Sequence, residues 1–588
     1  MGGLVRTVDR HGVRTLARAG ACLLLAAVAA ACSRPESDSP EPAAGGTLVV
    51  GIPAAPDSLN IYLARSSASL LVANRVLPRL AEERLPDDRH EAGLFPLLAE
   101  RWETEDDGRT LVFHLRRSGR WTTGDPITCE DVAFTFEVQT SEKIAWRAAS
   151  IKRFVESVEC RDDATPVFHF TRAYPGMVMD ANDLHILPRS LRERPFDTWR
   201  EIDWNRELPA AGPFRLGESA DPQEIVLERH DAYYADPQLP WLDRLVLRVV
   251  PDPAARLAQL LSGDIHLALA LSPDAAAQVA RRADLMVVRR PRPAYTYVGW
   301  NVLDPAAYRD YRAARLRWCD REGRSHCPDD PEEVARLARE HPHPLFGDAR
   351  VRKALTLAID RETIVDTVLL GEGEVPASPI LAPLPDHDPN LAPWPFDPDR
   401  AKALLRDAGF RDSDGDGTLE KDGRDFAFEL LVQAGNRTRR DAAVMIQRDL
   451  ARLGIAVTVR PVDNSAFYPL IARREMDAWI GGWLTSLRTD IADLLTARAC
   501  GSEGNNFGSW SDPEGDRLAL EATETLDPKR RAELWHRWEA VFHAQQPYTI
   551  LFRAMRLTGV SRRVHGVESM LANDDLAGVE HWWLEPGR

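Results

Sequence analysis

The stretch "TRRDAAVMIQRDLARLGIAVTVR", residues 438–460, determines the fold class that the sequence predicts. Its apolar side chains recur at helical spacing before Gly454 and alternate after it: Ala443, Ile446, Leu450 and Leu453, then Ile455, Val457 and Val459. A glycine can end a helix, and alternation is typical of a half-buried strand. A helix that leads directly into a strand predicts helices layered on a sheet, so we expect an α/β fold.

Similar patterns occur along the rest of the chain. Strand-like stretches include "TLVVGIP" (47–53), "RTLVFHLR" (109–116) and "LDRLVLRVV" (242–250). With 588 residues the chain exceeds what one hydrophobic core usually supports, so we expect two or three lobes. Residues 306–344 are rich in proline, histidine and charge with little periodicity, which favours an insertion on the surface.

The first 31 residues predict a targeting segment. The apolar run "ACLLLAAVAAAC" (21–32) is too short to cross a bilayer and follows four arginines: Arg6, Arg10, Arg14 and Arg18. The small residues before Cys32 resemble the lipobox of bacterial lipoproteins, whose cysteine is diacylated and becomes the new N-terminus. We therefore expect a signal peptide at 1–31 and a lipidated, flexible tether at 32–45; an ordinary secretory signal is the alternative.

Export makes disulfides possible. Five cysteines remain once Cys22 and Cys32 are set aside: Cys129, Cys160, Cys319, Cys327 and Cys500. The best pair is Cys319 with Cys327, because the two lie close together in one polar segment. Pairing of Cys129 with Cys160 stays open, and an odd number leaves one thiol over.

The charge and the motifs limit the function. A formal net charge of −16 argues against nucleic acid and an anionic membrane surface as partners. The sequence lacks the GxSxG, HExxH, P-loop and GxGxxG patterns that mark common enzymes. We therefore expect no catalysis and no cofactor.

One loop is a candidate for calcium. "DSDGDGTLEKDG" (412–423) begins like an EF-hand loop, with Asp412, Asp414 and Asp416 as oxygen ligands. The twelfth position, which needs a glutamate, is Gly423, and a strand-like stretch follows. A polar turn is the favoured interpretation, and no metal is expected.

Several blocks together resemble the extracellular solute-binding proteins (family 5) of bacterial ABC transporters for peptides, oligopeptides and nickel. They occur in the order of that family: "GGTLVVGIPAAPDSLN" (45–60), "PLLAERWETEDDGRTLVFHLRRSGRWTTGDPITCEDVAFTFE" (96–137), "DARVRKALTLAIDRETIVDTVLLGEGEVPASP" (348–379), "FDPDRAKALLRDAGF" (396–410), "DSDGDGTLEKDG" (412–423), "GGW" (481–483), "NNFGSWSDPEGD" (505–516) and "PYTILF" (547–552). The resemblance covers residues 46–588 apart from the insertion.

This resemblance implies a bilobal, periplasmic-binding-protein-like fold of three subdomains. Lobe I would comprise 46–295, including a subdomain at about 81–212, and lobe II would comprise 296–550. Residues 551–588 would return to lobe I. Two crossing strands, near 294–302 and 547–553, would form the hinge.

The implied function is a monomeric, lipid-anchored receptor in the periplasm or on the cell surface. It would capture peptides or peptide-like solutes between its lobes and deliver them to a permease with a separate ATPase. A receptor for a nickel chelate or another small solute is one alternative, and an exported lipoprotein hydrolase is another.

The candidate site is derived from "GGWLTSLRTDIADLL" (481–495). In the family a Gly-Trp leads into the cleft, which matches Trp483, and an aspartate three residues later binds the ligand amine. That position is Ser486 here, so Asp490, seven residues after the tryptophan, is the acid expected to face the cleft; a surface position or a helix N-cap is its alternative. Tyr297 and Asn301 on the hinge strand are further candidate contacts.

Overall fold

The structure is a computed structural model that describes residues 42–87, 89–105, 107–183, 185–489 and 491–586. The described residues from 44 onward form one compact unit. The predicted signal peptide and the lipidation site Cys32 lie outside the described residues. No helix within the described ranges is both long enough and apolar enough to cross a membrane.

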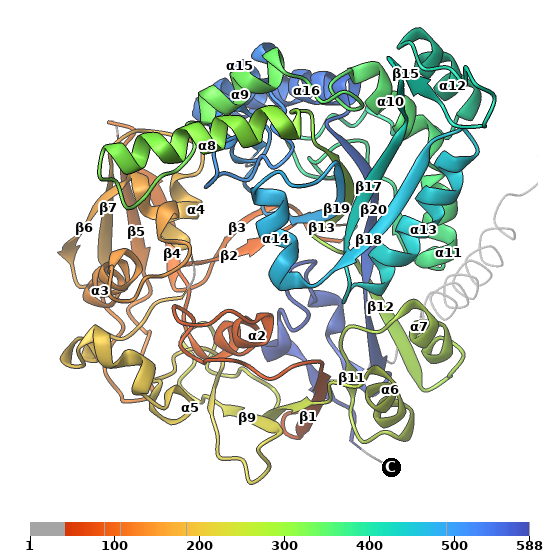
Figure 1. Cartoon of the computed structure of the whole chain (residues 1–588). Coiled ribbons are helices and arrows are strands. Elements are labelled where there is room, and N and C mark those ends of the chain that lie inside the picture. Colours follow the sequence, from red (N-terminus) through yellow and green to blue (C-terminus); the bar gives the residue numbers. More distant parts are fainter. Residues whose placement is uncertain (1–41, 88, 106, 184, 490, 587–588) are drawn as a thin grey trace, which may run out of the picture. The chain divides into compact units, whose positions relative to one another are not determined.

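One large mixed sheet runs through this unit (Figure 1). Its path is β18-β17-β19-β13-β20-β11-β1-β10-β9-β8, with β12 and β14 paired to β20. The bounds are β1 Thr47–Ile52, β8 Phe214–Leu216, β9 Glu224–Arg229, β10 Arg244–Val249, β11 Leu267–Ala268, β12 Leu285–Pro291, β13 Ala294–Trp300, β14 Gly373–Glu374, β17 Ala427–Gln433, β18 Ala456–Val462, β19 Ala478–Leu484 and β20 Tyr548–Ser561. Parallel pairs such as β17 with β18 occur beside antiparallel pairs such as β13 with β19.

Strand β20 lies at the centre of this sheet. Its first half pairs with β13, and its second half pairs with β12 and β11. Two hydrophobic cores lie on the β13 side and draw mainly on residues between 295 and 552. A third core combines residues 48–270 with residues 560–582, so the last elements described pack against the first ones described.

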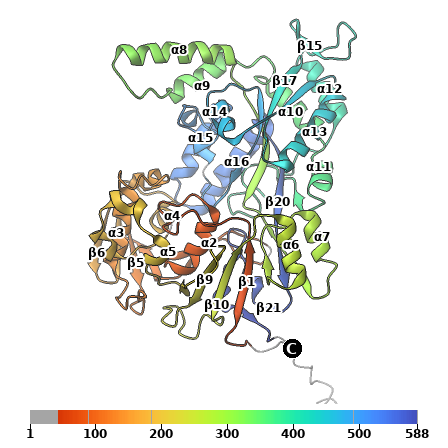
Figure 2. The same ribbon diagram turned by 60° about the horizontal axis from the view of Figure 1, so that its bottom comes forward.

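Helices cover the sheet, as the stretch at 438–460 predicted (Figure 2). They are α2 Ser67–Val76, α3 Cys129–Thr140, α4 Met177–Asn182, α5 Trp204–Glu207, α6 Pro253–Ser262, α7 Pro273–Val279, α8 Pro305–Arg321, α9 Pro331–Glu340, α10 Ala349–Ala358, α11 Arg361–Val368, α12 Pro398–Asp407, α13 Arg437–Ala451, α14 Asn464–Ala472, α15 Pro513–Glu524 and α16 Pro528–Gln545. Helix α13 followed by strand β18 is the predicted helix and strand unit.

A repeated Asp-Pro signal explains where many of these helices begin. The aspartate side chain caps the first backbone N–H groups, and proline, which has no N–H to leave unsatisfied, occupies the first helical position. This pattern starts α6, α8, α9, α12, α15 and α16.

A separate four-stranded antiparallel sheet lies within residues 99–170, in the order β4-β5-β7-β6. Its strands are β4 Ala99–Thr104, β5 Thr110–Leu115, β6 Val155–Asp162 and β7 Thr165–Phe170. The short hairpin strands β2 Ala81–Arg84 and β3 Gly93–Pro96 precede it. A disulfide joins Cys129 of α3 to Cys160 of β6, which settles the pairing that the sequence left open.

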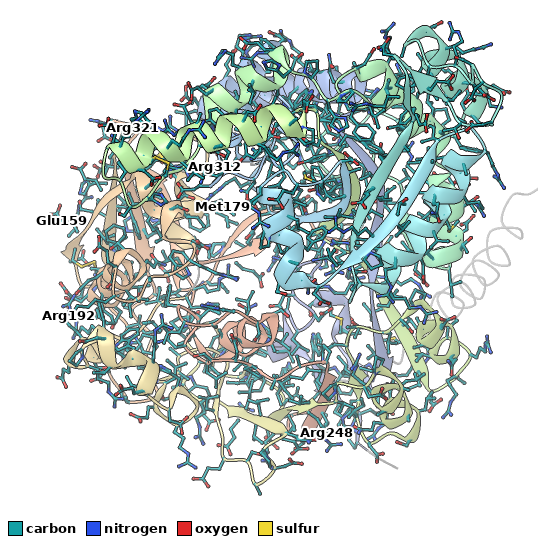
Figure 3. All side chains as sticks on the ribbon, viewed as in Figure 1. Glu159, Met179, Arg192, Arg248, Arg312 and Arg321 are labelled. Carbon is teal, nitrogen blue, oxygen red and sulfur yellow. A yellow bond between two sulfur atoms is a disulfide. The ribbon has the colours of Figure 1, made fainter. Side chains whose placement is uncertain are left out.

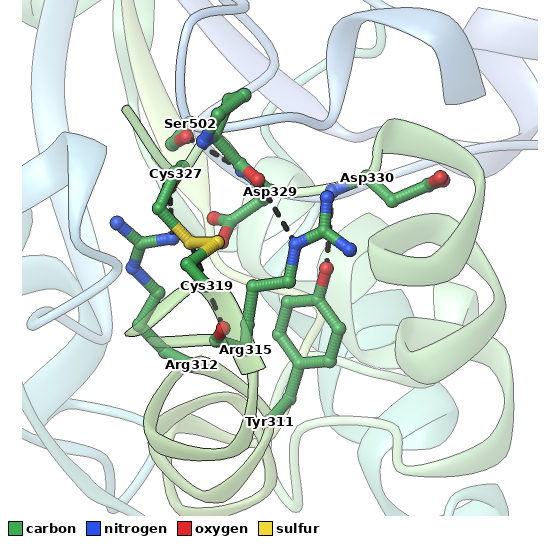
Figure 4. The surroundings of a disulfide bond; sticks show 9 residues. Tyr311, Arg312, Arg315, Cys319, Cys327, Asp329, Asp330 and Ser502 are labelled. Carbon is green, nitrogen blue, oxygen red and sulfur yellow. Dashed lines mark hydrogen bonds and ion pairs between the residues drawn. A yellow bond between two sulfur atoms is a disulfide. The ribbon is translucent and has the colours of Figure 1, made fainter. Parts of the chain in front are cut away.

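The insertion at 306–344 is more regular than the sequence predicted, because α8 and α9 occupy most of it. Helix α8 buries only Tyr308 and Cys319, so its sequence has little amphipathic periodicity. The expected disulfide between Cys319 and Cys327 forms (Figure 4). Cys500 is left as a buried thiol. Asp329 anchors the loop between the two helices through Arg312 at 2.8 Å and Ser502 at 2.9 Å.

Candidate functional site

Strand β19 and the turn after it carry the predicted site. Tyr295 of β13 pairs with Trp483, and Thr296 pairs with Gly482, so this end of β19 lies beside the predicted hinge strand. The residues from Gly482 to Thr489, here called the cleft segment, lie along three adjoining cavities.

The three cavities share lining residues, so they form one series along the cleft segment. The hinge cavity, about 540 Å³, is lined by Ser272, Arg292, Thr296, Arg439, Gly482 and Met555 among others. The small cavity, about 90 Å³, is lined by Tyr295, Ile380, Trp483, Ser486 and Leu494 among others. The outer cavity, about 140 Å³, is lined by Phe154, Tyr174, Met179, Arg488 and Trp535 among others; Met179 is labelled in Figure 3.

Trp483 and Ser486 both line the small cavity. The Trp483 ring stacks on Phe507, with centroids 6.1 Å apart and planes 12° apart, and it is only partly buried. Ser486 Oγ accepts a hydrogen bond from Arg488 N at 3.1 Å, which tightens the turn. Asp490, the expected amine ligand, lies outside the described residues.

Tyr297 and Asn301, the candidate contacts on the hinge strand, are packed in the interior and line none of the three cavities. Tyr297 is 1 % exposed, and its ring stacks on Tyr548 with centroids 4.0 Å apart. Asn301 is fully buried, donates to Met476 O at 3.1 Å and accepts from Leu303 N at 3.2 Å. Tyr297 lies in β13 and Asn301 directly follows it, and both faces of this part of the strand are covered, which a motif match does not reveal.

Leu484 was not predicted from the sequence. It is 77 % exposed, although it follows Trp483 and ends a buried strand, and it lines both the hinge cavity and the small cavity. An exposed leucine beside a cavity offers apolar surface to a ligand. The sequence feature that could have indicated Leu484 is its position at the end of an apolar run, directly after the tryptophan expected to lead into the cleft.

The cleft segment is also tied to the region around the small sheet. Arg488 forms an ion pair with Asp180 of α4, and Leu487 N donates to Glu83 Oε1 of β2 at 3.0 Å. Asp180 also accepts from Tyr174 through its carboxylate, and its backbone oxygen accepts from Lys152. Burial lowers the pKa of Lys152 to about 8. No local sequence pattern could indicate the Arg488 contact, because Asp180 lies 308 residues earlier in the chain.

The acidic loop has a different arrangement from the one its sequence suggests. Carboxylate oxygens of Asp412, Asp414 and Glu420 lie within 4.8 Å of one another, so Glu420 replaces Asp416 in the group. Asp412 accepts backbone N–H groups from Gly415 at 2.8 Å and Gly417 at 3.2 Å. These hydrogen bonds are those of a polar turn.

Comparisons with known proteins define the class. The model of the bacterial extracellular solute-binding proteins, family 5 (middle region), matches residues 93–505. The chain belongs to this family of solute-binding proteins.

Two relatives and one solved structure illustrate the similarity. The oligopeptide-binding protein AppA of Bacillus subtilis is 28 % identical over 577 residues, 96 % of this chain and 97 % of the relative. The heme-binding protein A of Haemophilus influenzae is 25 % identical over 520 residues, 82 % of this chain and 83 % of the relative. The structure of B. subtilis AppA in complex with a nonapeptide has a TM-score of 0.69 at 27 % identity, covering 93 % of this chain and 100 % of that one. The predicted periplasmic-binding-protein-like α/β fold is thereby confirmed.

Proposed function

We propose that this protein is the peptide receptor of an ABC importer, which captures a peptide or peptide-like solute along the cleft segment and presents it to the permease. The observation that carries this proposal is the row of three adjoining cavities beside Trp483, Leu484 and Arg488. A row of cavities suits an extended chain better than a compact solute. AppA, similar over nearly the whole chain, binds an oligopeptide in the same fold.

We assign lobe I to 46–295 with 551–588, and lobe II to 296–550, in this proposal. β12, β13 and β20 would then be the connection that bends when the lobes close on a ligand. Contacts between Arg488 and Asp180, and between Leu487 and Glu83, would form only in the closed state. A ligand that touches both sides shifts the population toward that state.

Trp483 would stack on an apolar part of the ligand, and Ser486 would line its path. Asp490 keeps its proposed role as the group that binds a ligand amine.

The receptor would act as a monomer anchored through acylated Cys32 in the periplasm or on the cell surface. Two acyl chains give stable membrane attachment. A Cys32→Ser chain should therefore leave the membrane fraction and lose incorporated fatty acid, with Cys22→Ser as the matched control. Retention of Cys32→Ser in the membrane pellet would contradict the lipoprotein proposal.

The alternatives receive less support from the cavities. A receptor for a cationic solute needs an acidic lining, whereas the outer cavity carries more arginine than aspartate. A hydrolase needs a nucleophile, a base and an orienting group placed together, and the family is one of binding proteins.

Mass spectrometry of ligand released from gently purified protein tests the proposed function. The wild-type protein should release peptides, and the Trp483→Ala variant, prepared in parallel, should release clearly fewer. Release of heme, of a metal chelate, or of equal peptide from both proteins would contradict the proposal for this site.

A further inference from the structure

The loop at residues 378–388, here called the wall loop, contributes to the walls of two of the three cavities. Pro379, Ile380 and Leu384 line the small cavity, and Asp386 lines the outer cavity. Ile380 and Leu384 are buried in the hydrophobic core that also includes side chains of α16. The position of the wall loop therefore decides how much room the small cavity offers.

One carboxylate, that of Glu539, holds both ends of the wall loop. At the start of the loop, Ser378 Oγ donates to Glu539 Oε1. At its end, His387 Nδ1 donates to the same oxygen at 2.7 Å, and the backbone N–H of Asp388 donates to Oε2 at 2.6 Å. The two ends of the loop are thus clamped on a single side chain, as in a compact loop whose ends lie close together.

Glu539 is itself fixed by its surroundings. It lies in α16 and is fully buried. A buried carboxylate is costly unless its oxygens accept hydrogen bonds, so the donors from the wall loop stabilise Glu539 as much as Glu539 stabilises the loop. Ser378 Oγ also accepts from Ile380 N at 3.1 Å, which connects the clamp to a residue of the small cavity.

The wall loop is also bonded to the cleft segment. Asp386, next to His387, accepts hydrogen bonds from Thr489 Oγ1 at 2.8 Å and from Arg531 Nε at 3.3 Å. Thr489 is the last residue of the cleft segment and lines both the small and the outer cavity. A displacement of His387 would therefore reach the cleft segment through Asp386.

The size and lining of the small cavity select the group that fits it. Its volume is about 90 Å³, whereas an apolar cavity of about 150 Å³ is known to hold a benzene ring. An aromatic ring therefore needs more room than this cavity offers, and a branched aliphatic group fits better. The wall is largely apolar, with Ile380, Leu384, Ile491 and Leu494 among its residues.

We propose that Glu539 is a positioning residue for ligand selection, which clamps the wall loop so that the small cavity admits an aliphatic side chain and excludes an aromatic ring. This inference rests on the proposed peptide-binding function and specifies which peptides fit. Glu539 acts through Ser378, His387 and Asp388 and does not itself touch the ligand. Leu384, on the cavity wall, is the residue that the ligand side chain contacts.

Two pools of random octapeptides measure this selection. The aliphatic pool is built from glycine, serine, leucine and isoleucine, and the aromatic pool from glycine, serine, phenylalanine and tryptophan. The measured quantity is the ratio in which the protein retains the two pools, determined by mass spectrometry. The wild-type protein should favour the aliphatic pool on the order of tenfold, because an aliphatic side chain that fills the small cavity is removed from water.

Variants connect this ratio to the clamp. Glu539→Gln keeps the side-chain size but sets an NH₂ group against the donors of the loop, so most of the preference should be lost. Leu384→Ala enlarges the cavity directly and should improve retention of the aromatic pool. His387→Leu should act like Glu539→Gln, whereas His387→Asn, whose amide nitrogen can replace Nδ1 as the donor, should keep the preference. Glu533→Gln is the matched control, because Glu533 lies on the same helix and its side chain is 65 % exposed.

A merely structural role of Glu539 predicts a different result. It would lower the melting temperature of Glu539→Gln and His387→Leu but leave the ratio of the two pools unchanged, and this outcome would overturn the inference. If Glu539→Gln does not fold, the two His387 variants decide, and equal ratios in His387→Leu and His387→Asn would overturn it. Equal retention of both pools by the wild-type protein would also overturn it but leave the proposed function standing.

A second measurement does not depend on peptides. At equal millimolar concentrations, isoamyl alcohol should raise the melting temperature of the wild-type protein more than benzyl alcohol does, and His387→Leu should lose this difference. If neither pool is retained but the difference is present, the proposed function fails and the role of Glu539 remains. If neither the pools nor the alcohols show a difference, the role of Glu539 is refuted.

Discussion

The ion pair between Arg488 and Asp180 should set how tightly the protein closes on its ligand. Arg488→Met keeps much of the side-chain volume and removes the charge. Asp180 is 4 % exposed and Arg488 is 24 % exposed in the pair. At an effective dielectric of ~20, charges ~4 Å apart attract by ~4 kcal/mol, and desolvation of the guanidinium on closing offsets about half of this. The closed state should lose about 2 kcal/mol, which weakens ligand binding ~30-fold.

Calorimetry on Arg488→Met, Asp180→Asn and the double variant measures this coupling. If the pair acts by closing the cleft, the double variant should bind nearly as well as either single variant. Arg488 also lines the outer and small cavities, so a direct contact with ligand is the competing explanation. An Arg488→Met effect that is just as large in the Asp180→Asn background would refute closure by this ion pair. Small-angle scattering of the ligand-bound proteins should show a more open Arg488→Met variant.

Three further outcomes are expected. Trp483→Ala should weaken peptide binding by about 2 kcal/mol in calorimetry, because a stacked indole beside two cavities is lost. Leu316→Ala, which changes an exposed residue of α8 that lines none of the three cavities, should bind normally. Unchanged binding by Trp483→Ala would place the site elsewhere. EDTA should leave the melting temperature unchanged, because backbone N–H groups already occupy the Asp412 carboxylate. A melting temperature that EDTA lowers and micromolar calcium restores would contradict this. Burial raises the pKa of Asp516 to about 6, so the folded state binds this proton more tightly than the unfolded chain, and the free energy of unfolding should fall as pH rises from about 4 to 6. Urea unfolding of Asp516→Asn should show no such pH dependence, and a pH profile identical to that of the wild-type protein would exclude Asp516 as its cause.

Much of the fold could be read from the sequence because the deciding signals are local. The unit formed by α13 and β18 needed only periodicity and a glycine, and the Cys319–Cys327 pair needed only short spacing. The insertion was less well predicted, since a helix that buries few side chains, such as α8, has little apolar periodicity.

The candidate site depended on long-range packing and was predicted only in part. The motif led to Trp483 and Ser486, which do line a cavity. It gave no way to see that Tyr297 faces Tyr548 in the interior, or that Arg439 reaches over Gly482. Those placements depend on which face of β13 is covered and on a helix that begins more than 130 residues after that strand.

The course of β20 also bears on how the protein matures. A chain delivered across a membrane from its N-terminus onward would expose residues 46–290 long before β20 emerges. Until then β12 lacks its partner strand, β11 has only β1 beside it, and the core that combines residues 48–270 with residues 560–582 lacks Val560, Val579 and Trp582. The early portion would therefore stay loosely structured and open to proteases or chaperones until the last forty residues arrive. A truncation just before Tyr548 should accordingly damage the whole molecule and not only its end.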